Sequence, residues 1–486
     1  MRIFKPYKRI YFSLLIYLLG TPLIFAQYDS ISQGNQKIFD DFKSQINNDF
    51  AQFQSRNDSI FYTFLNNKWE EFTLFRDELQ TSKKPEEQPV SAEQAPIEIQ
   101  IFYKDIIDKS KANTHIIYND KPQGYQKVKR VSEQDLSFHG IQYNIEMPPL
   151  STKEDYHTEK GVAEFYKDLC LTNGIETIAD ELAEIRKEYS LNDWAFFDLL
   201  QNTAKHHYQD ENEQVLFVWY FLLQADYQVK IGYNQDSLYL LLAFTSPVYY
   251  RPYLWVNQQK YYVFNTKKTN DLESIKTYAI HHAKQQKTIS LLSAQLPQFP
   301  QITNKKSLKF QGKTIELSYD QSLCDFYSGY PSTELAVYLM KPLSDIARKR
   351  FMNILAPQII NMTDQEKINF LLNFIQFSFP YKSDIEQFSQ EKYMFAEETL
   401  AYPYTDCEDR VVLLDKLVKE FTDLKTIVLL YPDHVVLGVQ YQAMKQGAYI
   451  QYKGNNYYIA DPTYLGAKFG MLMSEFVNKK AQILTY

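Results

Sequence analysis

The sequence predicts an α+β protein, in which helices and antiparallel strands come from separate stretches of the chain. Apolar residues recur at helical spacing in the stretches 191–204 and 364–376. Short apolar runs joined by turn residues, such as Pro432–Asp433 and Gly454–Asn455, predict antiparallel hairpins. Together these two patterns indicate the α+β class.

The helix and strand patterns occur twice in the same order. The stretches from Glu211 and from Asp406 each show an acidic start, an apolar helix, two strands around a short turn and a strand with paired tyrosines. We interpret the first stretch as an incomplete copy of the second. The expected equivalent pairs are Cys407 with Asn212, His434 with Ser237, and Asp461 with Phe264 or Asn265. The first copy would then lack every reactive group.

The N-terminus has the layout of a secretory signal peptide over residues 1–26. Basic residues precede an apolar run from Ile10 to Ala26, with a plausible cleavage point after Ala26. Because Gly20 and Pro22 break the run, an uncleaved membrane anchor is the weaker alternative. We therefore expect an exported protein, periplasmic or extracellular, with no membrane span in the mature chain.

Four segments follow the signal peptide. Residues 27–80 carry mostly Phe at helical spacing, which predicts a long amphipathic helix or helical pair that docks on a partner protein or on the body of the chain. Residues 81–98 contain three prolines and no aromatic residue, as a linker does. Residues 99–300 are expected to form a middle α+β region that holds the incomplete copy. Residues 301–486 are expected to form a C-terminal domain.

The composition argues against several classes of partner. A formal net charge of -7 without a Lys/Arg cluster argues against nucleic acid and anionic membranes. The chain, with 14 glycines, contains no phosphate-binding loop. The paired histidines His206–His207 and His281–His282 lack Cys or acidic residues at metal-ligand spacing, so no metal and no cofactor are predicted. The aromatic content of 16% is expected in cores and strands rather than in carbohydrate-binding platforms.

The position of Cys407 suggests reactivity. Three cysteines, Cys170, Cys324 and Cys407, leave at least one thiol outside an internal disulfide in an oxidising compartment. Cys407 stands directly before an apolar helical pattern, where Thr405 or Asp406 can cap the helix. A helix N-terminus lowers the pKa of a thiol, but the acidic neighbours of Cys407 act in the opposite direction. An activated thiolate at this position therefore needs a base.

His434 and Asp461 follow Cys407 at two equal spacings of 27 residues. His434 lies between a turn and an apolar strand, and Asp461 comes at the end of another apolar strand. Adjacent antiparallel strands could bring the carboxylate beside the imidazole. The residue types predict Cys407 as nucleophile, His434 as base and Asp461 as the acid that orients the base. Taken singly, each has a structural alternative: a small buried cysteine, a structural histidine and a turn aspartate.

The sequences DCEDRVVLL, YPDHVVLGV and YYIADPTY resemble the three motifs of the transglutaminase-like superfamily, a papain-like cysteine fold found in many bacterial exported proteins. The resemblance covers roughly residues 360–470 and implies a C-terminal domain with an antiparallel sheet and the triad Cys407, His434 and Asp461. It makes Gln376, on the preceding helix, a candidate side-chain donor to the oxyanion, with a helix-surface amide as the alternative. Thr405 departs from the pattern, because glycine is often seen there.

The resemblance implies an enzyme whose thiolate attacks an amide or ester carbonyl and forms a thioester acyl-enzyme. Hydrolysis of a peptide or protein substrate is the first expectation, and transfer to an amine stays open. The alternative is a binding or scaffold protein that keeps the fold without turnover. The incomplete first copy and the Phe-rich segment 27–80 favour that alternative, and the three intact site residues count against it.

Overall fold

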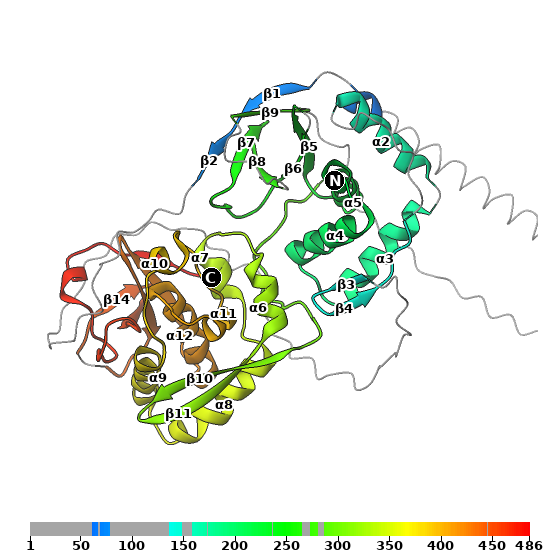
Figure 1. Cartoon of the computed structure of the whole chain (residues 1–486). Coiled ribbons are helices and arrows are strands. Elements are labelled where there is room, and N and C mark those ends of the chain that lie inside the picture. The colour runs from blue at the N-terminus through cyan, green and yellow to red at the C-terminus, as the bar shows by residue number, and fades with distance from the viewer. Residues whose placement is uncertain are drawn as a thin grey trace, which may run out of the picture. The chain divides into compact units, whose positions relative to one another are not determined.

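The computed structural model is a mixture of helices and antiparallel sheets, which confirms the α+β class (Figure 1). The expected signal peptide at 1–26 and the expected linker at 81–98 lie outside the residues that the structure describes. None of the helices within the described residues combines the length and the apolar character that a membrane crossing requires. The described residues are 61–66, 69–77, 136–147, 158–172, 174–235, 237–264, 273–279, 286–444 and 446–486.

The first large sheet has seven antiparallel strands in the order β1-β9-β5-β6-β8-β7-β2. Its outer strands, β1 and β2, are separated in sequence by Leu74 alone. A single segment of chain therefore runs along both edges of this sheet. The strands are β1 (Glu70–Thr73), β2 (Phe75–Arg76), β5 (Val229–Asn234), β6 (Ser237–Leu242), β7 (Pro252–Val256), β8 (Gln259–Phe264) and β9 (Ser274–Thr277).

The end of the expected helical segment 27–80 is a strand pair, so that prediction was wrong for residues 70–76. Residues 61–65 are helical, as expected. After them, Phe72 and Leu74 pack on the apolar face of the first sheet, while Thr73 between them is exposed. Side chains that alternate between exposed and partly buried are typical of an edge strand. This segment is therefore a strand paired with β9 and β7, although its aromatic residues recur at helical spacing.

Helices of the middle region pack beside this sheet. The helix α5 (Glu211–Gln224) is apolar almost all round, and every residue from Val215 to Leu223 is buried, as expected for a helix in a core. The other helices and the small hairpin are α2 (Glu159–Leu171), α3 (Ile175–Glu188), α4 (Asp193–His207), β3 (Leu136–Phe138) and β4 (Ile141–Tyr143).

The C-terminal region is built on a second antiparallel sheet, with five strands in the order β14-β15-β13-β12-β16. Its central helix, α12 (Cys407–Phe421), packs on β13 (His434–Gln440) and against α9 (Asp364–Ser378). The other strands of this sheet are β12 (Thr426–Tyr431), β14 (Tyr449–Tyr452), β15 (Asn455–Ala460) and β16 (Gln482–Leu484). A separate two-stranded sheet of the same region is formed by β10 (Thr303–Phe310) and β11 (Lys313–Asp320). The remaining helices are α6 (Gln321–Ser328), α7 (Leu335–Met340), α8 (Asp345–Ile359), α10 (Asp384–Phe388), α11 (Ala396–Ala401) and the 3-10 turn η1 (Ser474–Phe476).

The two sheets share a strand order and a register. The order β7-β8-β6-β5-β9 in the first matches β14-β15-β13-β12-β16 in the second. Asn234 pairs with Ser237 as Tyr431 pairs with His434, so Ser237 is the equivalent of His434, as predicted. The equivalent pairs at the other end of the second strand are Leu240 with Phe264 and Leu437 with Ala460. By this register the equivalent of Asp461 is residue 265, which lies outside the described residues.

At the helix start the expected equivalence is shifted by one residue. The N-cap of α5 is Asp210 and that of α12 is Asp406, so the residue opposite Cys407 is Glu211, and Asn212 stands opposite Glu408. The prediction that Asn212 occupies the cysteine position was therefore wrong. Alignment by residue type ignored the cap, and it is the cap that determines where a helix begins: the Asp210 side chain accepts the N–H groups of residues 212 and 213.

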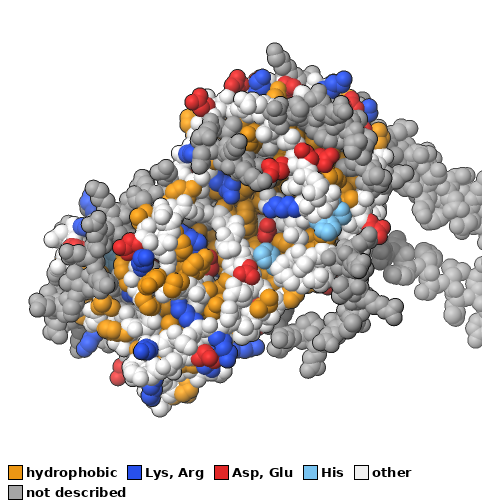
Figure 2. Space-filling model, viewed as in Figure 1, with side chains coloured by type: hydrophobic (Ala, Val, Ile, Leu, Met, Phe, Trp, Pro, Cys, Tyr) orange, Lys and Arg blue, Asp and Glu red, His pale blue; other side chains and the backbone are white. Residues whose placement is uncertain are grey.

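Acidic and basic side chains are interspersed on the face of the described residues shown in Figure 2. This mixture agrees with the low net charge of the whole sequence. A nucleic-acid-binding surface typically carries a continuous basic stripe, whereas this face of the described residues carries charges of both signs.

Candidate active site

Cys407 is the first residue of α12 and is buried, with 2% of its surface exposed. Asp409, in the first turn, holds the start of this helix in place. Its Oδ2 accepts the backbone N–H of Asp406 over 3.1 Å, and its Oδ1 accepts the N–H of Met394 over 2.8 Å. The predicted placement of Cys407 at a capped helix N-terminus is thus confirmed.

The residue where the superfamily often has glycine, Thr405, is held by a neighbouring segment. Its N–H donates to the carbonyl of Pro380 over 3.0 Å, and its own carbonyl accepts the N–H of Lys382 over 3.2 Å. These two backbone bonds define the path of the chain just before Cys407 without requiring a left-handed backbone conformation.

His434 and Asp461 are in direct contact, as predicted. His434 is the first residue of β13, and its Nε2 lies 2.8 Å from Asp461 Oδ2. The other carboxylate oxygen accepts the N–H groups of Thr463 and Tyr464, over 2.9 and 3.1 Å. Because β15 pairs with β13 and Asp461 follows β15 directly, the sheet register places the carboxylate beside the imidazole.

Phe476 and Asp461 hold the His434 ring. Phe476 stacks on the imidazole, with ring centroids 4.9 Å apart and an interplanar angle of 23°. Burial lowers the pKa of His434, but the carboxylates of Asp461, Glu408 and Glu475 raise it, and the net shift of the pKa is upward. The contact with Asp461 uses Nε2, so Nδ1 is the second ring nitrogen.

Arg410 joins the segment before Cys407 to the segment after Asp461. Its Nε donates to Thr405 Oγ1 over 3.0 Å, one terminal nitrogen donates to the carbonyl of Pro462 over 3.2 Å, and the other to the carbonyl of Phe379. Burial lowers the pKa of the guanidinium to about 10, although the nearby carboxylates of Asp406 and Asp461 favour its charged form. Sequence reasoning missed this residue, since a buried and a surface arginine in a helix look alike in sequence.

The side-chain amide of Gln376 is hydrogen-bonded within the protein through both its nitrogen and its oxygen. Its Nε2 donates to the carbonyls of Asp461 and Ala467, each over 3.1 Å, and its Oε1 accepts the N–H of Gly466 over 3.1 Å. Both amide hydrogens are therefore used to hold the loop that follows Asp461. A role as oxyanion donor would require one of these bonds to be released.

Three buried acidic residues near the start of α12 have the geometry to hold a metal ion. One carboxylate oxygen from each of Asp384, Glu391 and Asp406 lies within 4.8 Å of the others. The sequence predicted no metal, because the paired histidines lack Cys or acidic residues at metal-ligand spacing. The guanidinium of Arg410 interacts electrostatically with Asp406 and so places positive charge beside this cluster.

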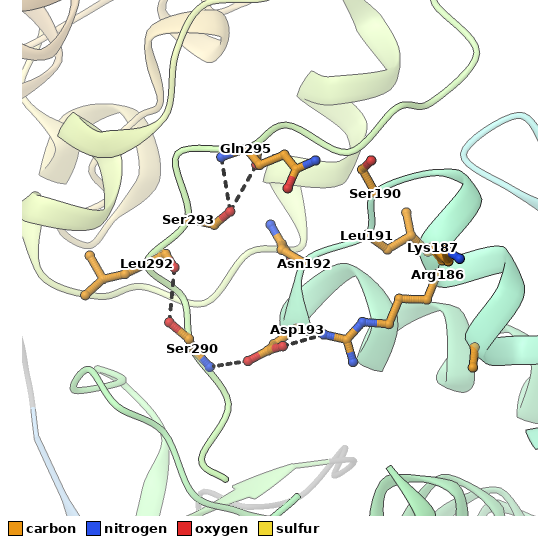
Figure 3. Close-up of a pocket in the computed structure, with 11 residues that line it drawn as sticks. Arg186, Lys187, Ser190, Leu191, Asn192, Asp193, Ser290, Leu292, Ser293 and Gln295 are labelled. Atoms are coloured by element: carbon orange, nitrogen blue, oxygen red, sulfur yellow. Dashed lines mark hydrogen bonds and ion pairs between the residues drawn. The ribbon is translucent and has the colours of Figure 1, made fainter. Parts of the chain in front are cut away.

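A separate groove of about 490 Å³ lies in the middle region (Figure 3). Asp193, one of its lining residues, is hydrogen-bonded within the protein: Oδ1 accepts Arg186 and Tyr227, and Oδ2 accepts the N–H of Ser290. The groove is not built from α12, β13 or β15. Its lining residues are Ala183, Arg186, Lys187, Ser190, Leu191, Asn192, Asp193, Ser290, Leu292, Ser293 and Gln295.

Cys324 lies in α6 and Cys170 in α2, outside the helix and strands that carry Cys407, His434 and Asp461. The three cysteines are all within the described residues, and no disulfide joins any two of them. Cys324 Sγ donates to the carbonyl of Glu397 over 3.6 Å, and burial, with the charge of Glu397, raises the pKa of this thiol well above its ordinary range. Cys324 is therefore an inert internal reference for the reactivity of Cys407.

Comparison of the chain with protein-family models, curated proteins and solved structures finds no match. The resemblance to the transglutaminase-like superfamily therefore depends on the motif residues of the sequence and stays a prediction.

Proposed function

We propose that the protein is an exported, transglutaminase-like cysteine enzyme that carries an acyl group as a thioester on Cys407. The observation that carries the proposal is the buried His434–Asp461 pair in the same domain as a cysteine at a helix N-terminus. Arg410 supports it, because this side chain is hydrogen-bonded to residues on both sides of the arrangement. A base–acid pair at strand ends, with a cysteine at the start of the helix that packs on one of those strands, is the kind of arrangement found in nucleophile–base–acid sites.

In the proposed reaction the S–H proton of Cys407 passes to Nδ1 of His434, since Nε2 is held by Asp461. This transfer requires the sulfur to come within about 4 Å of Nδ1. The thiolate attacks the carbonyl carbon of a peptide-like amide, the C–N bond breaks, and the imidazolium returns the proton to the leaving nitrogen. Water then hydrolyses the thioester, or an amine converts it into a new amide. Hydrolysis is the first expectation.

The first turn of α12 supplies donors for the oxyanion. The first backbone N–H groups of a helix have no carbonyl partner within that helix, and they point towards a group at its N-terminus. We assign Gln376 and Arg410 to positioning, because their hydrogen bonds hold the loop that follows Asp461 and the segment before Cys407. Gln376 acts through Asp461 and Arg410 through both segments.

We also propose that α5 and strands β5–β9 are an incomplete copy of the unit formed by α12 and strands β12–β16. The shared strand order and register support this relation. In the copy Ser237 replaces the base and Glu211 replaces the nucleophile, so the copy has a structural or binding role. Location outside the cytoplasm is part of the proposal and depends on the N-terminal layout of the sequence.

A thiol-directed acyl probe tests the enzyme proposal directly. In the full chain at neutral pH, Cys407 should be acylated faster than Cys170 and Cys324, and His434→Gln should slow Cys407 alone. Mass spectrometry of the labelled peptides gives the rate at each site. Equal rates at the three cysteines, unchanged in the variant, would contradict the proposed nucleophile.

The alternative function is a scaffold that binds protein partners without turnover. The incomplete first unit favours it, since that unit keeps the architecture without a triad. Under this alternative, Cys407→Ser captures the same partners as the unchanged protein, and neither protein turns over peptide or amide substrates. Turnover that depends on Cys407 would exclude the scaffold as the whole function.

A further inference from the structure

The connection between β15 and β16 brings an aromatic ring back to His434. Phe476, in η1, has 1% of its surface exposed, and its ring stacks on the imidazole with centroids 4.9 Å apart and planes at 23°. The same phenyl ring lies 5.2 Å from the ring of Tyr431, which pairs with His434 across β12 and β13. Phe476 and Tyr431 belong to one apolar core cluster, so the ring that covers the imidazole is itself held in place.

An ion pair ties this connection to the turn that precedes His434. Lys479 Nζ lies 3.4 and 3.3 Å from the two carboxylate oxygens of Asp433, the residue directly before His434. The backbone N–H of Lys479 donates to the carbonyl of Phe476 over 3.0 Å, and the ammonium lies 4.6 Å from the centroid of the phenyl ring. Lys479 therefore contacts both the ring that covers the imidazole and the residue before the imidazole.

A stacked ring adds a constraint that the bond to Asp461 does not provide alone. A hydrogen bond at Nε2 fixes one atom of the imidazole, but the ring can still turn about the line between donor and acceptor. A phenyl ring against one face fixes the plane of the imidazole, and with it the direction of the second nitrogen. General-base catalysis depends on that direction, because a base takes a proton only within hydrogen-bond reach.

The unit around α5 has a shorter connection at the equivalent place. Residues 461–481 join β15 to β16, whereas residues 265–273 join the equivalent strands β8 and β9. The unit around α5 also has Ser237 at the position of His434. The longer connection, which carries Asp461 and Phe476, thus belongs to the unit that has an imidazole to hold.

We propose that residues 474–479 form a clamp that fixes the plane of the His434 imidazole, with Phe476 and Lys479 as positioning residues. The inference rests on the proposed function, because it takes His434 as the base, and it adds the residues that orient this base. Phe476 acts on the imidazole directly, and Lys479 acts through Phe476 and Asp433. The ring contributes more than the ion pair, because 38% and 26% of the two charged side chains are exposed and exposed pairs contribute little.

Phe476→Leu tests the clamp in the full chain, since leucine is apolar but has no ring. Acylation of Cys407 by the thiol-directed probe should slow by about tenfold to a hundredfold, as expected when a reacting group loses its orientation. In NMR spectra of the isotopically labelled protein, the Nε2–H proton of His434 should exchange with water faster, because the ring turns away from Asp461 part of the time. Phe476→Tyr keeps the ring and should keep both rates. Unchanged proton exchange in folded Phe476→Leu would overturn the clamp, whatever its acylation rate.

Lys479→Gln tests the ion pair without disturbing the core. Acylation of Cys407 should slow by about twofold to fivefold, the range for a partly exposed pair, and Lys479→Arg should restore the rate. Asp433→Asn should have a similar effect, and the double variant should be little slower than either single variant, because both remove one interaction. Lys468→Gln removes an exposed lysine of the same connection and should leave the rate unchanged. An equal loss in Lys468→Gln, or no rescue by arginine, would overturn the role of Lys479.

Phe476→Leu removes part of a core, so opening of the fold is measured separately. Cys324 is buried in α6, and iodoacetamide should alkylate it at the same slow rate in this variant and in the unchanged protein. If its alkylation becomes faster, the variant has opened, and the comparison of Lys479→Gln with Lys479→Arg then decides the proposal.

Failure of the clamp and failure of the enzyme proposal give different results. If His434→Gln slows the acylation of Cys407 while Phe476→Leu changes neither acylation nor proton exchange, the base stands and the clamp is wrong. If Phe476→Leu speeds the exchange of the imidazole proton while His434→Gln leaves the acylation of Cys407 unchanged, the clamp holds the ring and the enzyme proposal is wrong.

Discussion

The unit around α12 and the unit around α5 differ in the side-chain interactions between the start of the helix and the second strand. In the first unit Asn212 Oδ1 accepts the backbone N–H of Leu238 over 2.8 Å, directly beside Ser237. In the second, Glu408 occupies the position of Asn212, accepts the Cys407 thiol and acts on the histidine at the Ser237 position. The same backbone thus accommodates a neutral structural bridge or a set of ionisable groups.

This difference teaches that the architecture does not depend on the reactive groups. Both units have the same strand order, although only the second has Cys, His and Asp at the described equivalent positions. Substitutions at the reactive positions should therefore affect chemistry more than folding. Substitutions at groups that join segments should do the reverse.

The largest expected effect is on turnover, from Cys407→Ser. A serine hydroxyl is far harder to ionise beside the same base, so kcat/KM for a peptide or amide substrate should fall by about 10⁴-fold. The free energy of unfolding should change by about 1 kcal/mol or less, because the volume hardly changes. Steady-state kinetics and chemical denaturation give the two numbers. Ser237→Ala in the first unit is the matched control, and the expectation fails if it lowers turnover as much.

The second effect is on stability, from Arg410→Met. Methionine fills much of the same space but leaves the carbonyls of Pro462 and Phe379 without their charged donor. Each buried carbonyl left without its donor costs about 1–3 kcal/mol, so the two together should lower the free energy of unfolding by about 2–6 kcal/mol, measurable by urea denaturation.

The equivalent residue of the first unit, counted from the cap, is Gln214, whose Nε2 donates to the carbonyl of Tyr208 over 2.9 Å. Gln214→Met should cost only about 1 kcal/mol, the usual net value of a neutral hydrogen bond. Equal costs for the two substitutions would show that Arg410 has no special role in joining segments.

The third effect is on the pH dependence of activity, from Asp461→Asn. The carboxylate raises the pKa of His434, so in the unchanged protein kcat/KM should rise with pH through a midpoint above the ordinary histidine value of about 6.5. In the variant the midpoint should move to lower pH, and the maximum should fall by about a hundredfold or more as the ring loses its orientation. A pH–rate profile with an unmoved midpoint would contradict this coupling.

The same substitution should alter the pH dependence of stability. Since the folded-state pKa of His434 is raised, its protonated form stabilises the folded protein below about pH 6.5, and this contribution is lost as pH rises through the folded-state pKa. Asp461→Asn should flatten that decline in unfolding free energy. Denaturation curves recorded across this pH range make the comparison.

The smallest effect is expected from Asn212→Ala, which breaks the bridge in the first unit. Loss of the bond to Leu238 should cost about 1 kcal/mol, and substrate turnover should stay unchanged. A thermal unfolding curve together with kinetics suffices. A large loss of activity would show that the first unit contributes to the reaction.

Much of the C-terminal region could be predicted because its signals are local. The apolar spacing after Cys407, the turn at Pro432–Asp433 and the turn at Gly454–Asn455 each specify an element from a few neighbouring residues. The contact between His434 and Asp461 followed from antiparallel pairing of adjacent strands.

The remaining features depend on distant parts of the chain. Residues 70–76 become strands only because β9 and β7, about two hundred residues later, offer edges to pair with. The burial of Arg410 depends on carbonyls from two other segments, and the engagement of Gln376 depends on the loop after Asp461. Such contacts leave no periodic pattern, so a single sequence does not reveal them.

The segment Glu70–Arg76 covers both edges of the first sheet, and contacts of the next residue, Asp77, keep it in place. Asp77 accepts the hydroxyl of Tyr253 over 3.1 Å and pairs with Lys260, while its carbonyl accepts the N–H of Tyr250 over 2.9 Å. Proteolytic trimming past Asp77 would uncover the backbone of β9 and β7 together. A chain shortened there would carry two open docking edges, and at high concentration it would be prone to link end to end with its own copies.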